Sequence, residues 1–141
     1  PRWRRVAPAR DGVEGRGLVA AVVVGAHPVR AEVGELLQLR AVTVYDGFSQ
    51  CDCNIHIASD ESGTWLRRAF LVASFMHPFA QWDLRRITGL VPAKNRKALD
   101  FDLHLGFVQE GYLRDALPDD DIVLLGMLRK DCRYIHPEYR K

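Results

Sequence analysis

Apolar residues change their spacing several times along this chain, and that change is the strongest limit on how it can fold. Alternating apolar and polar positions predict strands, whereas apolar positions three and four residues apart predict helices. The expected elements, in chain order, are a strand at 18–25, a helix at 27–40, strands at 41–48 and 51–59, a helix at 59–79, a strand at 85–91, a helix at 93–105, and strands at 107–113 and 122–128. This order predicts an α/β fold with a mixed sheet, because helices between strands make crossover connections.

Length and charge set broader limits. The chain has 141 residues and a formal net charge of +2, which suit one domain and argue against a nucleic-acid binder with a clustered basic face. Residues 1–16 are expected to form a basic flexible tail, and residues 17–141 a single domain. The apolar stretch 17–26 is about half the roughly 20 residues that a membrane helix needs.

The cysteines indicate a cellular compartment. There are three, at Cys51, Cys53 and Cys132, and an odd number without a secretory signal is typical of reduced thiols in a cytoplasm. A metal site at Cys51 and Cys53 with nearby His56 does not match the usual zinc spacings, so no metal is expected.

The helices expected at 59–79 and 93–105 have different end signals. Asn95 suits the start of the helix at 93–105, and Gly106 can adopt the left-handed conformation that ends it before Phe107 returns to the core. The helix at 59–79 is expected to be capped by Ser59 or Asp60 and to end near His77. Its expected apolar stripe consists of Trp65, Ala69, Val72, Ala73 and Met76.

The second half of the chain resembles the GNAT superfamily of acyl-coenzyme A N-acyltransferases. In that superfamily a late helix typically reads N-x-x-A and is followed by L-G-F and then by E-G-x-x-R. The matching residues here are Asn95, Ala98, Leu105-Gly106-Phe107, Glu110-Gly111 and Arg114. Segments 56–60, 77–79, 85–95 and 126–133 are similar to a compact branch found in bacteriophages and prophages. The resemblance covers residues 41–135.

This resemblance implies a mixed, mostly antiparallel sheet with a central parallel strand pair, flanked by helices. The pair would be 51–59 and 85–91, splayed so that acetyl-coenzyme A (acetyl-CoA) enters between them as co-substrate. The implied cofactor-binding residues are Ile57, Ala58, Gly63, Thr64, Trp65, Asn95 and Phe101. The amides of Gly63, Thr64 and Trp65 would hold the pyrophosphate at a helix N-terminus.

The phosphate turn departs from the family pattern [QR]-x-x-G-x-[GA]. In residues 60–65 only Gly63 agrees with it, and Asp60 and Glu61 stand where a phosphate should bind. Trp65 replaces a small residue, and its helical spacing favours a core position instead. The segment before residue 41 is also shorter than in complete members, which leaves the acceptor site undefined.

The implied reaction is attack of an amine on the thioester, which needs a proton acceptor. His56 is the candidate base, with Asp52 on the same strand face and Tyr45 as a candidate acid. Asp102 occupies the position where many members have a tyrosine, and it is expected to be ionised and unable to donate a proton. Two alternatives stay open: a structural role for His56, and Cys53 as an acyl-carrying nucleophile.

The function that this implies is N-acetyl transfer from acetyl-CoA to an amine of a small molecule or protein. The alternative is a non-catalytic GNAT-like phage or prophage interaction module with a degraded donor site. The expected partners are acetyl-CoA and an amine acceptor, with no membrane and no nucleic acid, and a homodimer stays open.

Overall fold

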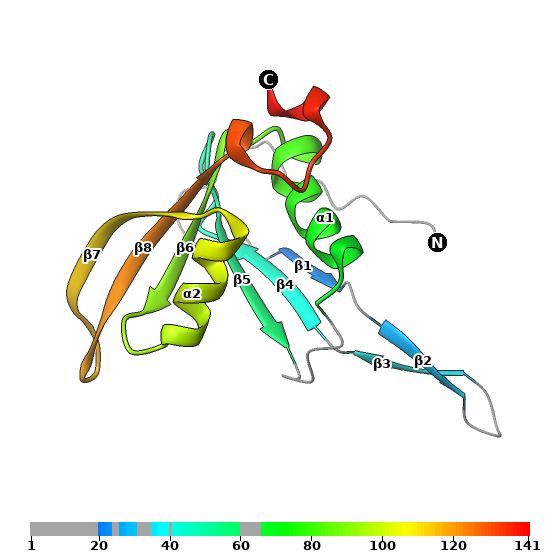
Figure 1. Cartoon of the computed structure of the whole chain (residues 1–141), viewed down its shortest axis with the longest axis horizontal. Helices are drawn as coiled ribbons and strands as arrows, with labels where there is room; N and C mark the ends of the chain where they lie inside the picture. Colours follow the sequence, from blue (N-terminus) through cyan, green and yellow to red (C-terminus); the bar gives the residue numbers. More distant parts are fainter. Residues whose placement is uncertain (1–19, 24–25, 31–34, 40, 60–65) are drawn as a thin grey trace.

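Six strands form one sheet in the order β1-β4-β5-β6-β8-β7 (Figure 1). The computed structural model describes residues 20–23, 26–30, 35–39, 41–59 and 66–141. The strands of the sheet are β1 (Ala20–Val23), β4 (Ala41–Asp46), β5 (Asn54–Ser59), β6 (Arg86–Pro92), β7 (Val108–Leu117) and β8 (Asp120–Leu128). Only β5 and β6 run parallel, and every other neighbouring pair is antiparallel. This is the mixed, mostly antiparallel sheet that the sequence predicted.

The expectation of a helix at 27–40 is wrong. The structure has a two-stranded hairpin there, β2 (Ala26–Arg30) and β3 (Glu35–Leu39), with Ala26 in register with Leu39. Short apolar runs satisfy both the helical and the strand spacing, so local pattern alone cannot distinguish them. Pro28 is compatible with a strand that has a free edge, because the missing N–H then costs no ladder hydrogen bond.

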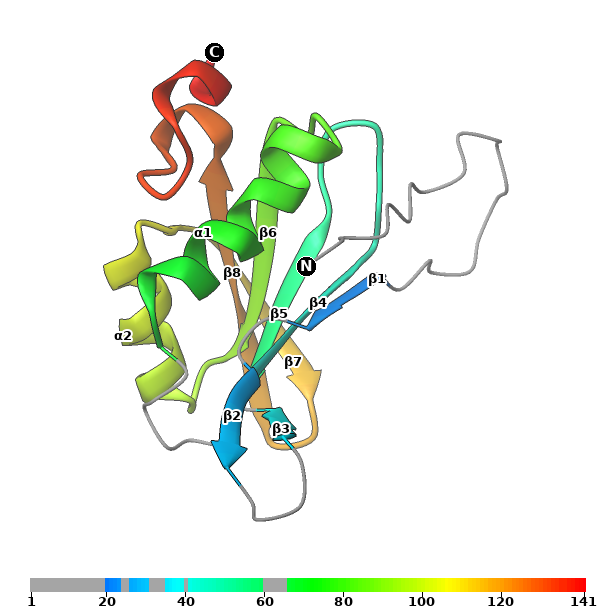
Figure 2. The ribbon, with the colours of Figure 1, turned by 90° about the vertical axis from the view of Figure 1, so that its right-hand side faces the viewer.

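The helices α1 (Arg68–Met76) and α2 (Arg96–Leu105) both lie on one face of the sheet (Figures 1 and 2). A π-helical turn, η1 (His77–Gln81), follows α1, and two short 3₁₀ turns, η2 (Arg129–Asp131) and η3 (Pro137–Arg140), lie near the C-terminus. Phe75 of α1 is fully buried and stacks on Tyr134 with ring centroids 5.2 Å apart. The core therefore lies between this helical layer and one side of the sheet.

The first helix differs from its sequence prediction at its start and in its buried face. Its N-cap residue is Arg67, while Ser59 belongs to β5 and Asp60 lies outside the described residues. The buried residues of α1 are Phe70, Leu71, Ser74 and Phe75. The expected stripe is thus wrong for Ala69, Val72 and Ala73, which are exposed or half-buried and are not part of the core. Met76 is half-buried and packs against the core, and Trp65 lies outside the described residues.

The second helix begins and ends where the sequence predicted. The side-chain oxygen of Asn95 accepts a hydrogen bond from the Ala98 amide at 3.1 Å, which satisfies one of the free donors of the first turn. Gly106 has φ 111°, a left-handed conformation that glycine adopts without a Cβ clash. Phe107 is then buried at the start of β7. These two ends fix the position of α2 between β6 and β7.

Candidate functional site

The candidate site lies where β5 and β6 separate. The two strands are in parallel register at a single position, Asn54 with Thr88, and the Thr88 amide donates to the Cys53 carbonyl at 2.9 Å. After this point, residues 55–59 and 89–92 are not paired with each other. The sequence prediction that these strands run parallel, side by side and splay at their C-terminal ends is therefore confirmed.

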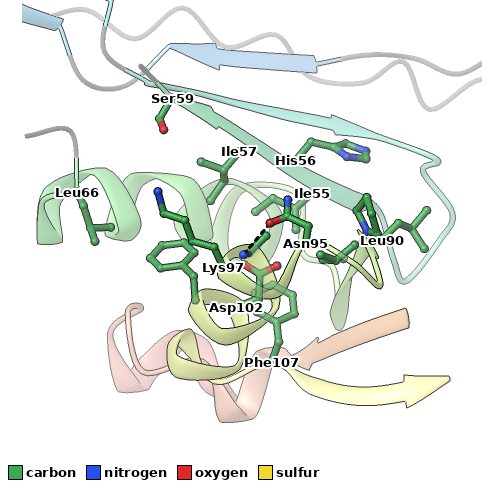
Figure 3. A pocket seen from close by; sticks show the side chains of 15 residues that line it. Ile55, His56, Ile57, Ser59, Leu66, Leu90, Asn95, Lys97, Asp102 and Phe107 are labelled. Atoms are coloured by element: carbon green, nitrogen blue, oxygen red, sulfur yellow. Dashed lines mark hydrogen bonds between the residues drawn. The ribbon is translucent and has the colours of Figure 1, made fainter. Parts of the chain in front are cut away.

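A pocket of about 550 Å³ opens between the separated strands and the N-terminal half of α2 (Figure 3). Apolar side chains form much of its wall, and the polar side chains at it come from β5 and α2. The lining residues are Ile55, His56, Ile57, Ser59, Leu66, Gly89, Leu90, Val91, Pro92, Asn95, Lys97, Ala98, Phe101, Asp102 and Phe107. A volume in this range suits a small-molecule ligand.

His56 lines this pocket and is held by the neighbouring strand. Its Nε2 lies 3.1 Å from Oδ2 of Asp46, and the Asn54 side chain donates to the other oxygen of Asp46 at 2.8 Å. The hydrogen bond from Asn54 and the nearby His56 keep the pKa of Asp46 below its usual value. The His56 side chain is 42% exposed, so solvent and a ligand can reach it. The three side chains form an ordered polar cluster at the edge of the pocket.

Asp46 is a site residue that the sequence reasoning missed. It follows from strand pairing, since β4 and β5 are antiparallel with Asp46 opposite Asn54 and Val44 opposite His56. Same-face neighbours on adjacent strands can interact across a diagonal. The register of β4 against β5 was needed to place this carboxylate beside His56.

Asp52 does not join His56. Its Oδ2 accepts a hydrogen bond from the Thr88 hydroxyl at 2.7 Å and lies 3.3 Å from Nε of Arg86. It is absent from the pocket lining. The expectation that Asp52 shares the site with His56 is therefore wrong, because Asp52 precedes β5 and interacts with β6 instead.

Tyr45 and Cys53 belong to the core. The Tyr45 hydroxyl donates to the Ser74 carbonyl, and its ring meets Trp82 edge-on with centroids 5.0 Å apart. Burial raises the pKa of Tyr45 far above its ordinary value. Burial also raises the pKa of the Cys53 thiol to about 12, so its thiolate is scarce at neutral pH. Neither residue lines the pocket. The expectation that Tyr45 is the acid is therefore wrong, and so is the alternative that Cys53 is an acyl-carrying nucleophile.

Asp102 has an unexpected environment. It lines the pocket from α2, and burial raises its pKa to about 6. About a tenth of the carboxyl is then protonated at pH 7. Asp102 is therefore still mostly ionised at pH 7, as expected, although removal from water penalises the charged form and leaves a small protonated fraction.

Several expected cofactor-binding residues line this pocket, namely Ile57, Asn95 and Phe101. Ala58 is exposed and does not line it. Gly63, Thr64 and Trp65 lie outside the described residues, and so does the predicted phosphate turn. Lys97 and residues 89–92 of β6 are the main lining residues that were not singled out from the sequence. The β6 residues line the pocket because β5 and β6 separate there.

The residues that the structure describes include neither a membrane-spanning helix nor a cluster of metal ligands. No helix in that part of the chain is both long and apolar enough to cross a membrane. No group of three or more His, Cys, Asp or Glu side chains there could hold a metal ion.

Comparison with solved structures gives the clearest likeness. A spermidine N-acetyltransferase from Vibrio cholerae, in complex with CoA and spermine, matches with a TM-score of 0.62 and 18% identity over 67% of this chain and 61% of that chain. A ribosomal-protein-S5-alanine acetyltransferase from Vibrio fischeri matches with a TM-score of 0.59 and 19% identity over 68% of this chain and 57% of that chain. No family model matches the sequence, and no curated protein matches it.

The match covers 58 to 67% of the length of the spermidine N-acetyltransferase structures. At 18 to 20% identity the likeness concerns the fold. The shared features are the mixed sheet, its one parallel pair and the helices beside it. The chain therefore has the fold of the GNAT N-acetyltransferases.

Proposed function

We propose that this chain is an N-acetyltransferase that transfers an acetyl group from acetyl-CoA to an amine. The observation that carries the proposal is the pocket between β5 and β6, which opens where the parallel pair separates after Asn54 and Thr88. The structural neighbours support the reaction class, since they are acetyltransferases and one of them was solved with CoA.

The pocket residues suit the pantetheine arm and thioester of acetyl-CoA. The facing backbone edges of residues 55–59 and 89–92 are not paired with each other, so an extended amide-containing ligand can hydrogen-bond to them as an added strand would. Ile57, Phe101 and Phe107 supply apolar wall around such a ligand. Bound there, acetyl-CoA supplies an activated acyl group.

His56 is proposed to act as the proton acceptor for the amine. It is a pocket residue, it is accessible, and Asp46 hydrogen-bonds its Nε2 from one side. A base held in place by a second group is the usual arrangement for removing a proton from a nucleophile. The role of Asp46 is positioning, and it would also stabilise the imidazolium that forms when His56 takes the proton.

Asp102 approaches the same pocket from α2 (Figure 3). With a pKa near 6 it is mostly an anion at neutral pH, and as such it can orient an ammonium or a water molecule. Two carboxylates near the pocket, Asp46 and Asp102, favour a cationic amine as acceptor. The neighbours differ in acceptor, spermidine in one case and a ribosomal protein in another, so the proposal extends to an amine of a small molecule or protein.

The competing proposal is a non-catalytic module that keeps the fold. Its support is in the sequence, where Asp60 and Glu61 occupy the segment in which the pyrophosphate should bind. The compact phage or prophage branch, a cytoplasmic location and a homodimer also remain proposals from the sequence. Binding of CoA separates the two functions directly, because only the enzyme requires it.

Adding CoA is expected to raise the unfolding free energy of the protein. A site with a micromolar dissociation constant, at 100-fold excess of ligand over that constant, stabilises the fold by about 2.7 kcal/mol. Thermal melts with and without CoA measure this, followed by calorimetry. ATP is the matched control, since it shares the adenine nucleotide but lacks the pantetheine arm that the pocket is proposed to bind. Equal shifts with CoA and ATP, or no shift at millimolar CoA, would contradict the proposed donor site and favour the non-catalytic module.

A further inference from the structure

A second cavity, of about 450 Å³, lies at the other end of the sheet. Six basic residues line it: Arg85, Arg86, Arg129, Lys130, Arg140 and Lys141. The two remaining lining residues are Cys51 and Leu128, so no lining residue is acidic. We call this cavity the basic pocket. A concave surface with one sign of charge concentrates the electrostatic potential inside it.

Two of the six cations have carboxylate partners. Arg86 pairs with Glu110 at 2.6 Å, and Arg129 pairs with Asp83. Among the residues that the structure describes, no ion pair with a carboxylate is formed by Arg85, Lys130, Arg140 or Lys141. The basic pocket therefore keeps an excess of positive charge.

Two of these four guanidinium and ammonium groups have only neutral partners. Nη2 of Arg85 donates to the Cys51 sulfur at 2.7 Å, and Nη2 of Arg140 donates to the Ile135 carbonyl at 3.2 Å. The Nε atom of Arg140 is buried and has no hydrogen-bond partner. A buried donor without an acceptor is costly, and native structures usually satisfy it with a ligand, ion or water. The guanidinium groups of Arg85 and Arg140 thus keep an uncompensated positive charge at the lining of the basic pocket.

The basic pocket is separate from the candidate acetyl-transfer site. The two share no lining residue. Strand β6 runs from Arg86, at the basic pocket, to Pro92, at the candidate site. The nearest residues of the two linings on this strand are Arg86 and Gly89, which at roughly 3.3 Å per residue are about 10 Å apart, and the candidate site extends from Gly89 away from the basic pocket. A phosphate of a donor bound between β5 and β6 is thus not the natural occupant of the basic pocket.

We propose that the basic pocket binds a compact phosphorylated ligand, a small phosphate or diphosphate ester. Guanidinium groups present paired N–H donors that match phosphate oxygens, and the bonds are strengthened by opposite charge. The cavity volume lies within the range of small-molecule sites. This inference does not rest on the proposed acetyl transfer.

The surroundings favour a compact ligand over a nucleic acid. A polynucleotide needs a basic stripe that continues along the surface. Asp83 pairs with Arg129 of the basic pocket, and Glu138 lies two residues before Arg140 in the sequence. Their side chains are 84% and 61% exposed. Asp131, next to Lys130, is exposed as well. A long phosphate backbone leaving the pocket would meet these carboxylates, whereas a small ester would not.

The test uses inorganic pyrophosphate as the probe, titrated by calorimetry into the full chain at constant ionic strength. Saturating CoA is present to occupy the donor site, and the titration is repeated without it so that the result stands whether or not CoA binds. The expected result is saturable binding that the double variant Arg85→Gln/Lys130→Gln weakens at least about tenfold, because two charge-assisted bonds are lost. The matched control, Arg96→Gln/Arg114→Gln, removes the same charge outside both pockets and is expected to change the affinity less than about twofold.

Three results would overturn the inference. One is no saturable binding at millimolar pyrophosphate. Another is equal weakening by the two double variants, which would mean a general effect of net charge. The third is tight binding of a single-stranded RNA that the Arg85→Gln/Lys130→Gln variant abolishes and pyrophosphate does not displace, which would assign the surface to nucleic acid. Circular dichroism of each variant confirms that it is folded before the titrations are compared.

Discussion

The His56→Ala variant is expected to acetylate its amine acceptor about 10²- to 10⁴-fold more slowly than the parent protein at pH 7, the range typical of general-base help. The physical reason is that His56 lines the pocket and is oriented by Asp46, whose Oδ2 accepts a hydrogen bond from Nε2 of His56 with 3.1 Å between the two atoms. Without the imidazole, an ammonium acceptor must lose its proton to water. The measurement is the initial rate of CoA release with a panel of amines, polyamines included.

The pH dependence makes this prediction specific. The loss should shrink as the pH rises toward the pKa of the acceptor amine, because the amine is then already neutral. Binding of CoA, followed by calorimetry, should be unchanged. His104→Ala is the matched control, since His104 is exposed on α2 and does not line the pocket. Full activity of His56→Ala at pH 7 would show that another group or the amine itself handles the proton.

The Asp46→Asn variant, measured in the same assay, distinguishes the orienting role of Asp46 from proton transfer by His56. The amide can still hydrogen-bond but cannot stabilise the imidazolium, so a smaller loss than that of His56→Ala is expected. Together the two variants show whether the cluster acts as a unit, in which case their effects do not add.

The Asp102→Asn variant is expected to be more stable than the parent by about 1 to 3 kcal/mol at pH 7.5, from a pKa shift of about two units. The pKa of Asp102 in the folded chain is about 6, above the unfolded value of 3.8, because burial disfavours the anion. At pH 7.5 both states are ionised and the folded state bears the desolvation cost. As the pH falls through 6 toward 4 the folded carboxyl takes up its proton first, so this cost disappears and the parent gains relative stability.

Urea unfolding at pH 7.5 and pH 4.5 measures the difference, which should fall to less than about half at the lower pH. Asp100→Asn is the matched control, because Asp100 is an exposed carboxylate on the same helix and should have little effect. If Asp102→Asn destabilises the protein at pH 7.5, the carboxylate has a favourable partner and its burial is not the dominant effect. If the variant is more stable but less active, the charged group is retained for its role in the pocket.

The parts of the fold that were predictable have strong local signals. In α2 the side chain of Asn95 caps the first turn, and Gly106 adopts a conformation that few other residues tolerate. The β7–β8 hairpin follows from two strand patterns and the short turn between them. The parallel pairing of β5 and β6 follows from the helix that connects them. In each case a few neighbouring residues decide the conformation.

Local pattern failed where tertiary packing decides. The segment at 27–40 satisfies a helical spacing but forms β2 and β3. In α1 the residues buried against the core are Phe70, Leu71, Ser74 and Phe75, which lie on a different side of the helix from the expected stripe. Both sets of residues recur at helical spacing, and the sequence alone does not show which face meets the sheet.

The sequence by itself determined the order of strands and helices from residue 41 onward, the ends of α2 and the placement of His56 at the separating strands. Only the tertiary structure decided which polar side chains meet there. Strand register brings Asp46 to His56 and leaves Asp52 with Thr88 and Arg86. Burial, which depends on the whole fold, removes Tyr45 from the site and raises the pKa of Asp102. Local conformation depends on neighbours in the chain, whereas register and burial depend on residues distant in sequence, and the chemistry of this site depends on both.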